Sequence, residues 1–158
     1  MTETFLLWLG GWPGALWLQE SWRAYLFVNA AHILGIGLLL GAILPLDLRL
    51  IGFMRGVPLG TIAPILDRTA TFGAALAIAT GLWLFTVKPL EYAGNAAFLA
   101  KLVLLALAFV NVAFQHSGGD YRTALAGGPV SAKVRTVAAL SALLWLAILI
   151  AGRWIGFI

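Results

Sequence analysis

The hydrophobic positions of this chain fall into four long blocks, and polar residues gather between them. A helix needs about 20 mostly apolar residues to cross a bilayer, at a rise of about 1.5 Å per residue. The pattern therefore predicts four membrane spans, over about residues 22–44, 68–87, 96–115 and 134–154. Unbroken apolar blocks exclude a membrane β-barrel, because apolar and polar residues alternate along the strands of a barrel. The expected fold class is all-α, a polytopic membrane four-helix bundle forming a single transmembrane domain over residues 1–158.

The first twenty residues follow a different pattern. Two short apolar runs flank Gly10–Gly14, and neither run is long enough to span. Trp8, Trp12 and Trp17 suit the headgroup region, where an indole ring is half hydrated. Residues 2–20 are therefore expected to form a broken interfacial helical segment at the membrane surface.

Prolines and glycines set the expected ends of the spans. Pro45 should end the first span, since the residue before a proline disfavours continued helix. Residues 46–53 then read as an amphipathic stretch at the interface, residues 56–67 as a loop, and residues 117–132 as a polar, glycine-rich loop.

Small residues recur at four-residue spacing in the first two spans. Gly73, Ala77 and Gly81 line one helix face, and Gly37 and Gly41 form a similar pair. This small-xxx-small pattern lets helices approach closely in lipid. We expect the first two spans to pack together, and the glycine faces also favour a homo-oligomer, a dimer.

The composition supports a protein embedded in lipid. The chain is 62% hydrophobic and 10% charged, against about 25% charged in soluble domains. Its net charge of +4 is dispersed around the spans and indicates contact with the lipid bilayer, with no nucleic acid partner. Cysteine is absent, which removes disulfides, thiolate metal sites and covalent haem attachment.

Four spans place both chain ends on the same side of the membrane. The two loops on the opposite side carry six basic residues, against four on the side of the termini. Positive residues favour the cytoplasmic side. The expected location is a bacterial inner membrane, with a multi-pass chain and both termini in the periplasm.

His32 is the strongest candidate for chemistry, because it lies within the first span, near the bilayer centre. Asn29 and Gly35 lie one turn away on either side. Ionisable groups inside a membrane indicate function by default, and glycine beside a histidine leaves room for a planar ring such as haem. The alternative is a histidine that only hydrogen-bonds a neighbouring helix.

Antiparallel counting brings Thr80 and Gly81 of the second span, and Trp145 of the fourth, to the depth of His32. Thr80 is expected to accept a hydrogen bond from the His32 ring, and Gly81 to leave a gap facing it. Gly81 is therefore included among the candidate cofactor-binding residues.

His116, at the end of the third span, is the second candidate metal ligand. Both axial ligands of one iron must lie at nearly the same depth, and counting from Pro45 places His32 about 20 Å from the boundary where His116 lies. This depth difference argues against one haem held by both histidines. Two haems with one histidine each, or one haem on His32 alone, remain open.

Charged residues gather where the first two spans end. Asp47 and Arg68, and likewise Asp67 and Arg49, are placed to form ion pairs. Two interpretations stay open for this cluster: fixing the loop and binding lipid phosphate, or a proton path through Asp47.

The segments AAHILGIGLLLGAILPLDLRLIG and FLAKLVLLALAFVNVAFQH resemble a family of short, uncharacterised four-helix bacterial inner-membrane proteins. That family is distantly similar to the membrane domains of CopD and cytochrome b561. The resemblance implies a histidine-ligated haem b and electron transfer with a quinone.

Three functional hypotheses follow. The first is a b-type cytochrome-like protein that transfers electrons to or from a quinone or a redox partner, with haem on His32 and also, in one version, His116. The second is a non-catalytic membrane subunit or scaffold that packs with partners or with itself. The third is a transporter for copper or another small solute, which two methionines and no cysteine disfavour.

Overall fold

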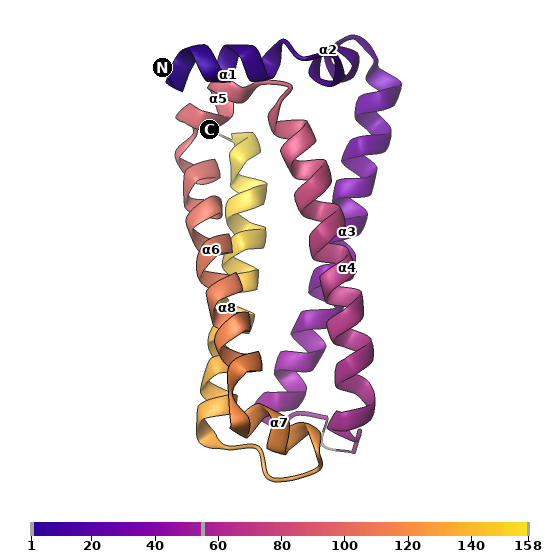
Figure 1. Cartoon of the computed structure of the whole chain (residues 1–158), viewed down its shortest axis with the longest axis vertical. Coiled ribbons are helices and arrows are strands. Elements are labelled where there is room, and N and C mark those ends of the chain that lie inside the picture. Colours follow the sequence, from indigo (N-terminus) through magenta and orange to yellow (C-terminus); the bar gives the residue numbers. More distant parts are fainter. Residues whose placement is uncertain (1, 55, 158) are drawn as a thin grey trace.

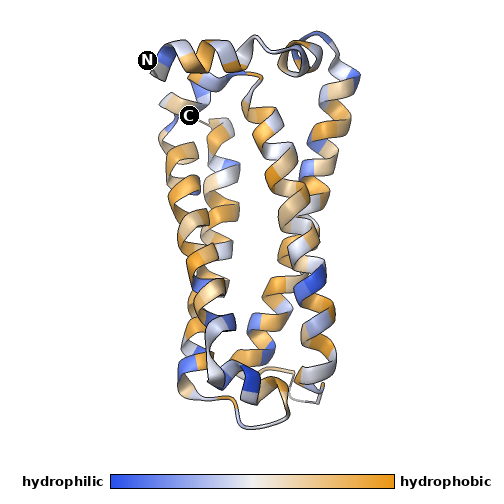
Figure 2. Ribbon diagram, in the orientation of Figure 1, coloured by the Kyte–Doolittle hydropathy of each residue, from blue (hydrophilic) through white to orange (hydrophobic). Residues whose placement is uncertain are grey.

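Four long helices form the body of the protein. The computed structural model describes residues 2–54 and 56–157. The long helices are α3 (Trp22–Ile51), α4 (Leu59–Phe85), α6 (Ala96–Ser117) and α8 (Ala132–Trp154), and they run alternately in opposite directions (Figure 1). Each is long and apolar enough to cross a membrane, and hydrophobic residues predominate along these helices (Figure 2). The protein is an all-α, multi-pass membrane protein, as the hydrophobic pattern predicts.

Short helices cover both ends of the bundle. α1 (Thr2–Gly10) and α2 (Pro13–Glu20) lie across the end that holds both termini, beside α5 (Pro89–Gly94) and the single 3₁₀ turn Ile155–Phe157 (Figure 1). We call this the terminal end. α7 (Gly119–Leu125) covers the opposite end, which we call the α7 end. The expected interfacial segment is thus two helices, with the break just before Pro13, a residue suited to the first turn of a helix.

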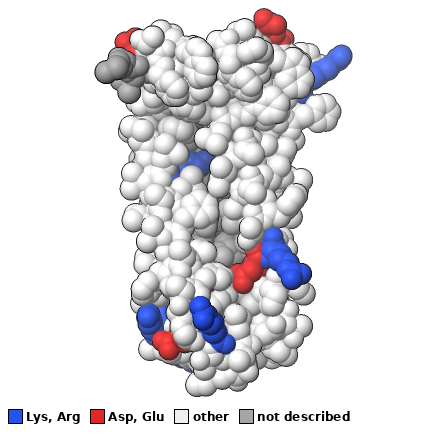
Figure 3. All heavy atoms as spheres, viewed as in Figure 1, with Lys and Arg blue, Asp and Glu red and all other residues white. Residues whose placement is uncertain are grey.

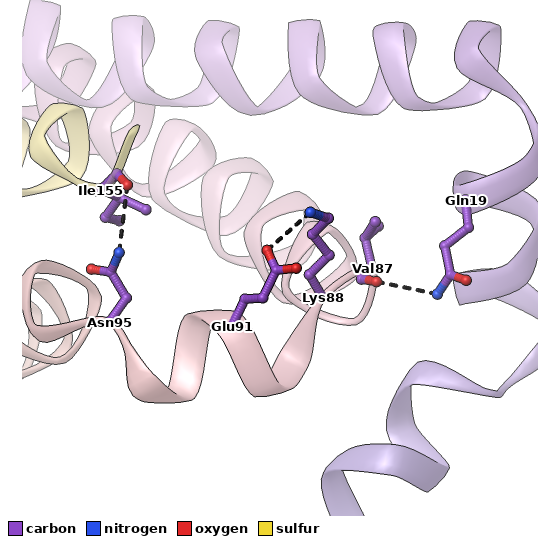
Figure 4. Close-up of polar contacts among 6 residues, drawn as sticks. All are labelled: Gln19, Val87, Lys88, Glu91, Asn95 and Ile155. Atoms are coloured by element: carbon purple, nitrogen blue, oxygen red, sulfur yellow. Dashed lines mark hydrogen bonds and ion pairs between the residues drawn. The ribbon is translucent and has the colours of Figure 1, made fainter. Parts of the chain in front are cut away.

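Polar contacts join the surface helices to the bundle at the terminal end. The indole Nε1 of Trp83 in α4 donates to the carbonyl oxygen of Gly14 at 3.0 Å. Figure 4 shows three further polar contacts in this region: Gln19 with Val87, Lys88 with Glu91, and Asn95 with Ile155. The Trp83 and Gln19 contacts hold α2 against the end of α4, and Gln19 also donates to the Gly10 carbonyl oxygen of α1 at 3.0 Å.

The predicted boundaries of two spans are wrong because both helices continue through a proline. Pro45 lies inside α3, which ends only at Ile51, where Gly52 adopts a φ of +125°. Pro64 lies inside α4, which begins at Leu59, within the segment 56–67 that was expected to be a loop. Membrane helices tolerate proline where neighbouring groups satisfy the freed carbonyl. The expected loop 117–132 also contains a helix, α7.

α3 and α4 pack together as expected, but through a different glycine. A Cβ atom on Gly35 would lie 2.7 Å from the backbone nitrogen of Ala77, and one on Gly73 would lie 2.5 Å from that of Leu39. Glycine is required at both positions, because the two backbones leave no space for a side chain. Gly37 and Gly41 instead face away from the other helices, since a Cβ atom on either would have no neighbouring atom within 4 Å.

Two core clusters hold all four long helices together, and both lie away from the terminal end. One surrounds Tyr121 of α7, and the other surrounds Trp145 of α8. Along α3, both clusters include only residues from Leu39 onward. Nearer the termini, α3 packs with α4 and α6 with α8, as two separate pairs (Figure 1).

Candidate functional site

The His32 ring is held on α3 by two hydrogen-bonding groups of α4. Its Nδ1 lies 2.9 Å from the carbonyl oxygen of Ala77 and 3.1 Å from Thr80 Oγ1. The Thr80 hydroxyl donates its own hydrogen to the Leu76 carbonyl oxygen at 2.6 Å. Because a carbonyl oxygen only accepts, Nδ1 carries the proton, and Nε2 keeps its lone pair in the neutral ring. The predicted contact with Thr80 is present.

Gly81 lies directly against this ring, as the sequence predicts, but the ring itself fills the space that was expected to be a gap. A Cβ atom there would be 2.9 Å from Cε1 of His32. The space beside Gly35, by contrast, is occupied by the backbone of α4. Gly35 therefore serves helix packing and leaves no room for a ligand. Thr80 and Gly81 therefore form one wall of the His32 site, and Gly35 does not.

Two further polar side chains lie near His32 without a partner of their own. Asn29, one turn earlier in α3, is half-buried and forms no hydrogen bond with the described residues. Lys101 of α6 is half-buried, makes no ion pair within residues 2–54 and 56–157, and is close enough to interact electrostatically with His32. We call the space between the two helix pairs the furrow. His32 belongs to one pair and Lys101 to the other, and Asn29 lies one turn from His32.

The furrow is visible from one side of the molecule. Figure 3 shows a hollow between the two halves of the bundle, with a basic side chain inside it. On the α6 side, the Lys101 ammonium lies 3.5 Å from the position of a Cβ atom on Gly152. The furrow therefore combines a histidine, an amide and a cation in a largely apolar surrounding.

His116 lies at the α7 end, in a separate cluster with Asp67 and Tyr121. Its Nε2 is 3.5 Å from Asp67 Oδ1, and the Tyr121 hydroxyl donates to Asp67 Oδ2 at 3.3 Å. Its Nδ1 lies 2.9 Å from the Val112 carbonyl oxygen. Burial and the nearby Asp67 and Asp47 carboxylates raise the pKa of the Tyr121 phenol above its ordinary value, so it remains a donor. The structure does not bring His116 and His32 together.

The two predicted aspartate–arginine pairs at this end are wrong. Asp67 pairs with His116, and the Arg49 Nε donates to the Val57 carbonyl oxygen at 2.8 Å. No ion pair joins Asp47 or Arg68 to another residue in the described part of the chain. Asp47 is only 3% exposed, and its Oδ2 has no hydrogen-bond partner.

A small cavity of about 20 Å³ lies beside Asp47, between α3, α6 and α8. Its polar lining includes Ser141, whose buried hydroxyl also has no partner. Asn111 and Gln115 line it as well, and each donates from its amide nitrogen to an α8 carbonyl oxygen at 3.2 Å. The sequence pattern does not predict this cavity, because the cavity depends on Ser141 facing Asp47 from another helix.

The family model that matches residues 20–158 is described as a family of unknown function. The chain belongs to this family, DUF6644. No curated protein and no solved structure matches the chain.

The match takes in every long helix of this DUF6644 member, and with them both polar regions. The first is the His32 furrow, and the second is the Asp47 cavity with its neighbouring His116 cluster. Within the described residues, no three histidine, cysteine or acidic side chains are grouped to hold a metal ion.

Proposed function

We propose that this protein is a haem-binding membrane protein that transfers electrons, and that His32 is the residue that would hold the haem iron. The single observation that carries the proposal is the orientation of the His32 ring. Its Nδ1 proton is engaged by the Ala77 carbonyl oxygen, and Nε2 forms no hydrogen bond with the described residues. Histidine ligands of metals commonly donate their second ring nitrogen to a backbone carbonyl in this way, which fixes the tautomer and the ring direction.

The surroundings of His32 also fit haem b. Gly81 lies against the edge of the ring, so a side chain there would displace the imidazole. Lys101 supplies an unpaired cation near the furrow, which suits the carboxylates that a haem carries. An ammonium without a counter-ion is costly inside a membrane, so an anionic ligand explains its presence in α6.

Haem bound here supplies one-electron chemistry, and the protein controls its position and surroundings. His32 would hold the iron through Nε2, while the contacts of Nδ1 with Ala77 and Thr80 keep the ring from rotating. Lys101 stabilises negative charge near the furrow. His116, which is engaged with Asp67, takes no part in this one-haem version of the proposal. The electron partner is a quinone or a redox protein.

A visible spectrum of the purified protein tests this proposal. We expect a Soret band that shifts on reduction when the protein is produced in a haem-sufficient host. The band should disappear in His32→Ala and return partly when imidazole is added to a His32→Gly variant. His116→Ala is the matched control and should keep the band, because its ring lies in the separate cluster at the α7 end.

Two results would refute haem binding at His32. One is a colourless protein from a haem-sufficient host that also fails to bind added haemin. The other is a Soret band that is unchanged in His32→Ala. A colourless, well-folded protein would favour the second function, a membrane subunit or scaffold whose exposed apolar helices pack with a partner.

We also propose that the protein lies in a bacterial inner membrane with both termini in the periplasm. Both chain ends lie at the terminal end, and α1 and α2 there expose several indole rings that suit a headgroup layer (Figure 1). The α7 end carries the larger number of basic residues. A C-terminal fusion to alkaline phosphatase should be active, whereas one to a fluorescent protein that folds only in the cytoplasm should be dark.

A further inference from the structure

The cavity beside Asp47 is a polar space within the bundle that the haem proposal does not use. Asp47 and Ser141 are 3% and 4% exposed, and Asp47 Oδ2 and Ser141 Oγ both have no hydrogen-bond partner. Buried polar atoms are rarely left unpaired. A water molecule needs a cavity of about 10–15 Å³ and two to four polar partners. The observed cavity of about 20 Å³, which both side chains line, therefore fits a single water.

The remaining lining favours a proton over a metal cation. Asn111 and Gln115 direct their amide nitrogens to the Val137 and Val134 carbonyl oxygens, which leaves their amide oxygens as acceptors. Most of the other lining residues are aliphatic. Asp47 is the only acidic side chain that lines the cavity, so a divalent cation there would keep an uncompensated positive charge inside the membrane, which is costly. A proton requires only one carboxylate and a donor.

The titratable groups around Asp47 come from three neighbouring helices. α4 contributes Asp67, α6 contributes His116 and α7 contributes Tyr121, while α8 contributes the neutral Ser141. His116 and Tyr121 also line the cavity. The His116 side chain is 42% exposed, so this cluster touches both the cavity and the outside of the bundle at the α7 end.

We propose that this cavity is a proton-binding site inside the membrane, where Asp47 takes up a proton through one bound water. A proton enters the Asp67–His116–Tyr121 cluster from the aqueous side, and the cluster passes one proton to the cavity water. That water passes one of its own protons to Asp47 Oδ2, so the carboxylate becomes a carboxylic acid. One positive charge moves inward, and no electrons are exchanged. The site does not depend on haem.

Infrared spectroscopy of the full-length protein in lipid nanodiscs tests this site. Difference spectra between acidic and alkaline buffer should contain the carbonyl stretch of a protonated carboxylic acid. This band should be lost in Asp47→Asn and kept in Asp120→Asn, since Asp120 is exposed. Ser141→Ala should shift the band, because it removes a hydrogen-bonding group beside the cavity. Ser117→Ala, an exposed serine bonded to Phe114, should not shift it.

Each alternative outcome would overturn the proposal. A titrating band that is unchanged in Asp47→Asn would assign the proton elsewhere. The lack of any titrating carboxyl band in the wild-type protein would show that Asp47 binds no proton. A band that is lost when choline is replaced by sodium at equal ionic strength would indicate a metal cation site. If Asp47→Asn does not fold, Asp47→Glu must move the band for the assignment to stand.

Discussion

Replacing Gly73 by alanine tests the closest approach between α3 and α4. A Cβ atom at this position would lie 2.5 Å from the Leu39 nitrogen and 2.7 Å from the Gly35 carbonyl oxygen. Both are backbone atoms, so no side chain can rotate away to make room. The two helices must separate or shift along each other, and the His32 contacts with α4 shift with them.

The size of the effect follows from comparing Gly73 with Gly37, which is also inside a helix but has no neighbouring atom within 4 Å. Alanine is favoured over glycine in a helix by about 1 kcal/mol, and this gain applies to both sites. Overpacking costs about 1–3 kcal/mol, and it applies only to Gly73→Ala. We therefore expect Gly73→Ala to be less stable than Gly37→Ala by about 1–3 kcal/mol.

Unfolding in mixed micelles, in which a denaturing detergent gradually replaces a mild one, measures this difference by circular dichroism. Gly37→Ala should unfold at the same or a higher fraction of denaturing detergent than the wild type, and Gly73→Ala at a lower one. Equal midpoints for the two variants would refute the close contact between α3 and α4, and with it the placement of His32 against Ala77.

Three further substitutions test other parts of the bundle. Trp145 is 2% exposed, and its ring meets that of Phe109 edge to face at 5.9 Å. Trp145→Ala should lower the free energy of unfolding by about 3 kcal/mol. This is the low end for such a truncation, because lipid keeps the surroundings of the separated helices apolar. Trp154→Ala, at a 57% exposed site, should change stability by at most about 0.5 kcal/mol in the same unfolding assay. Gly41→Leu should weaken a homodimer in chemical crosslinking, since Gly37 and Gly41 form an outward-facing pair suited to a second copy; unchanged crosslinking would exclude this face.

Much of the fold could be predicted because lipid imposes simple rules on a sequence. Each span needs one apolar block, and all four blocks are helices in the structure. The helix ends were harder to predict. The rule that a helix stops before a proline fails here, because Pro45 and Pro64 both lie inside helices. Whether Gly35 or Gly37 contacts α4 depends on the rotation of α3 about its own axis. The sequence does not reveal this rotation, because α3 is hydrophobic on all sides.

The candidate site was partly predictable for a related reason. Two antiparallel helices joined by a short loop align by counting, so the contact of His32 with Thr80 and Gly81 follows from the sequence. The cluster of Asp67 with His116 does not, because it needs α7 to fold back and supply Tyr121. The Asp47 cavity needs α8 to present Ser141 at the matching height, and nothing in the loop lengths fixes this.

The arrangement of the helices in two pairs determines the direction from which the furrow is reached. α1 and α2 lie across the bundle at the terminal end, and the shared core closes it toward the α7 end (Figure 1). The remaining approach is sideways, through the acyl chains, between α4 and α6. A ligand of His32 would thus have to partition into the bilayer first. Lipophilic molecules are therefore favoured over water-soluble ones before any specific contact is made.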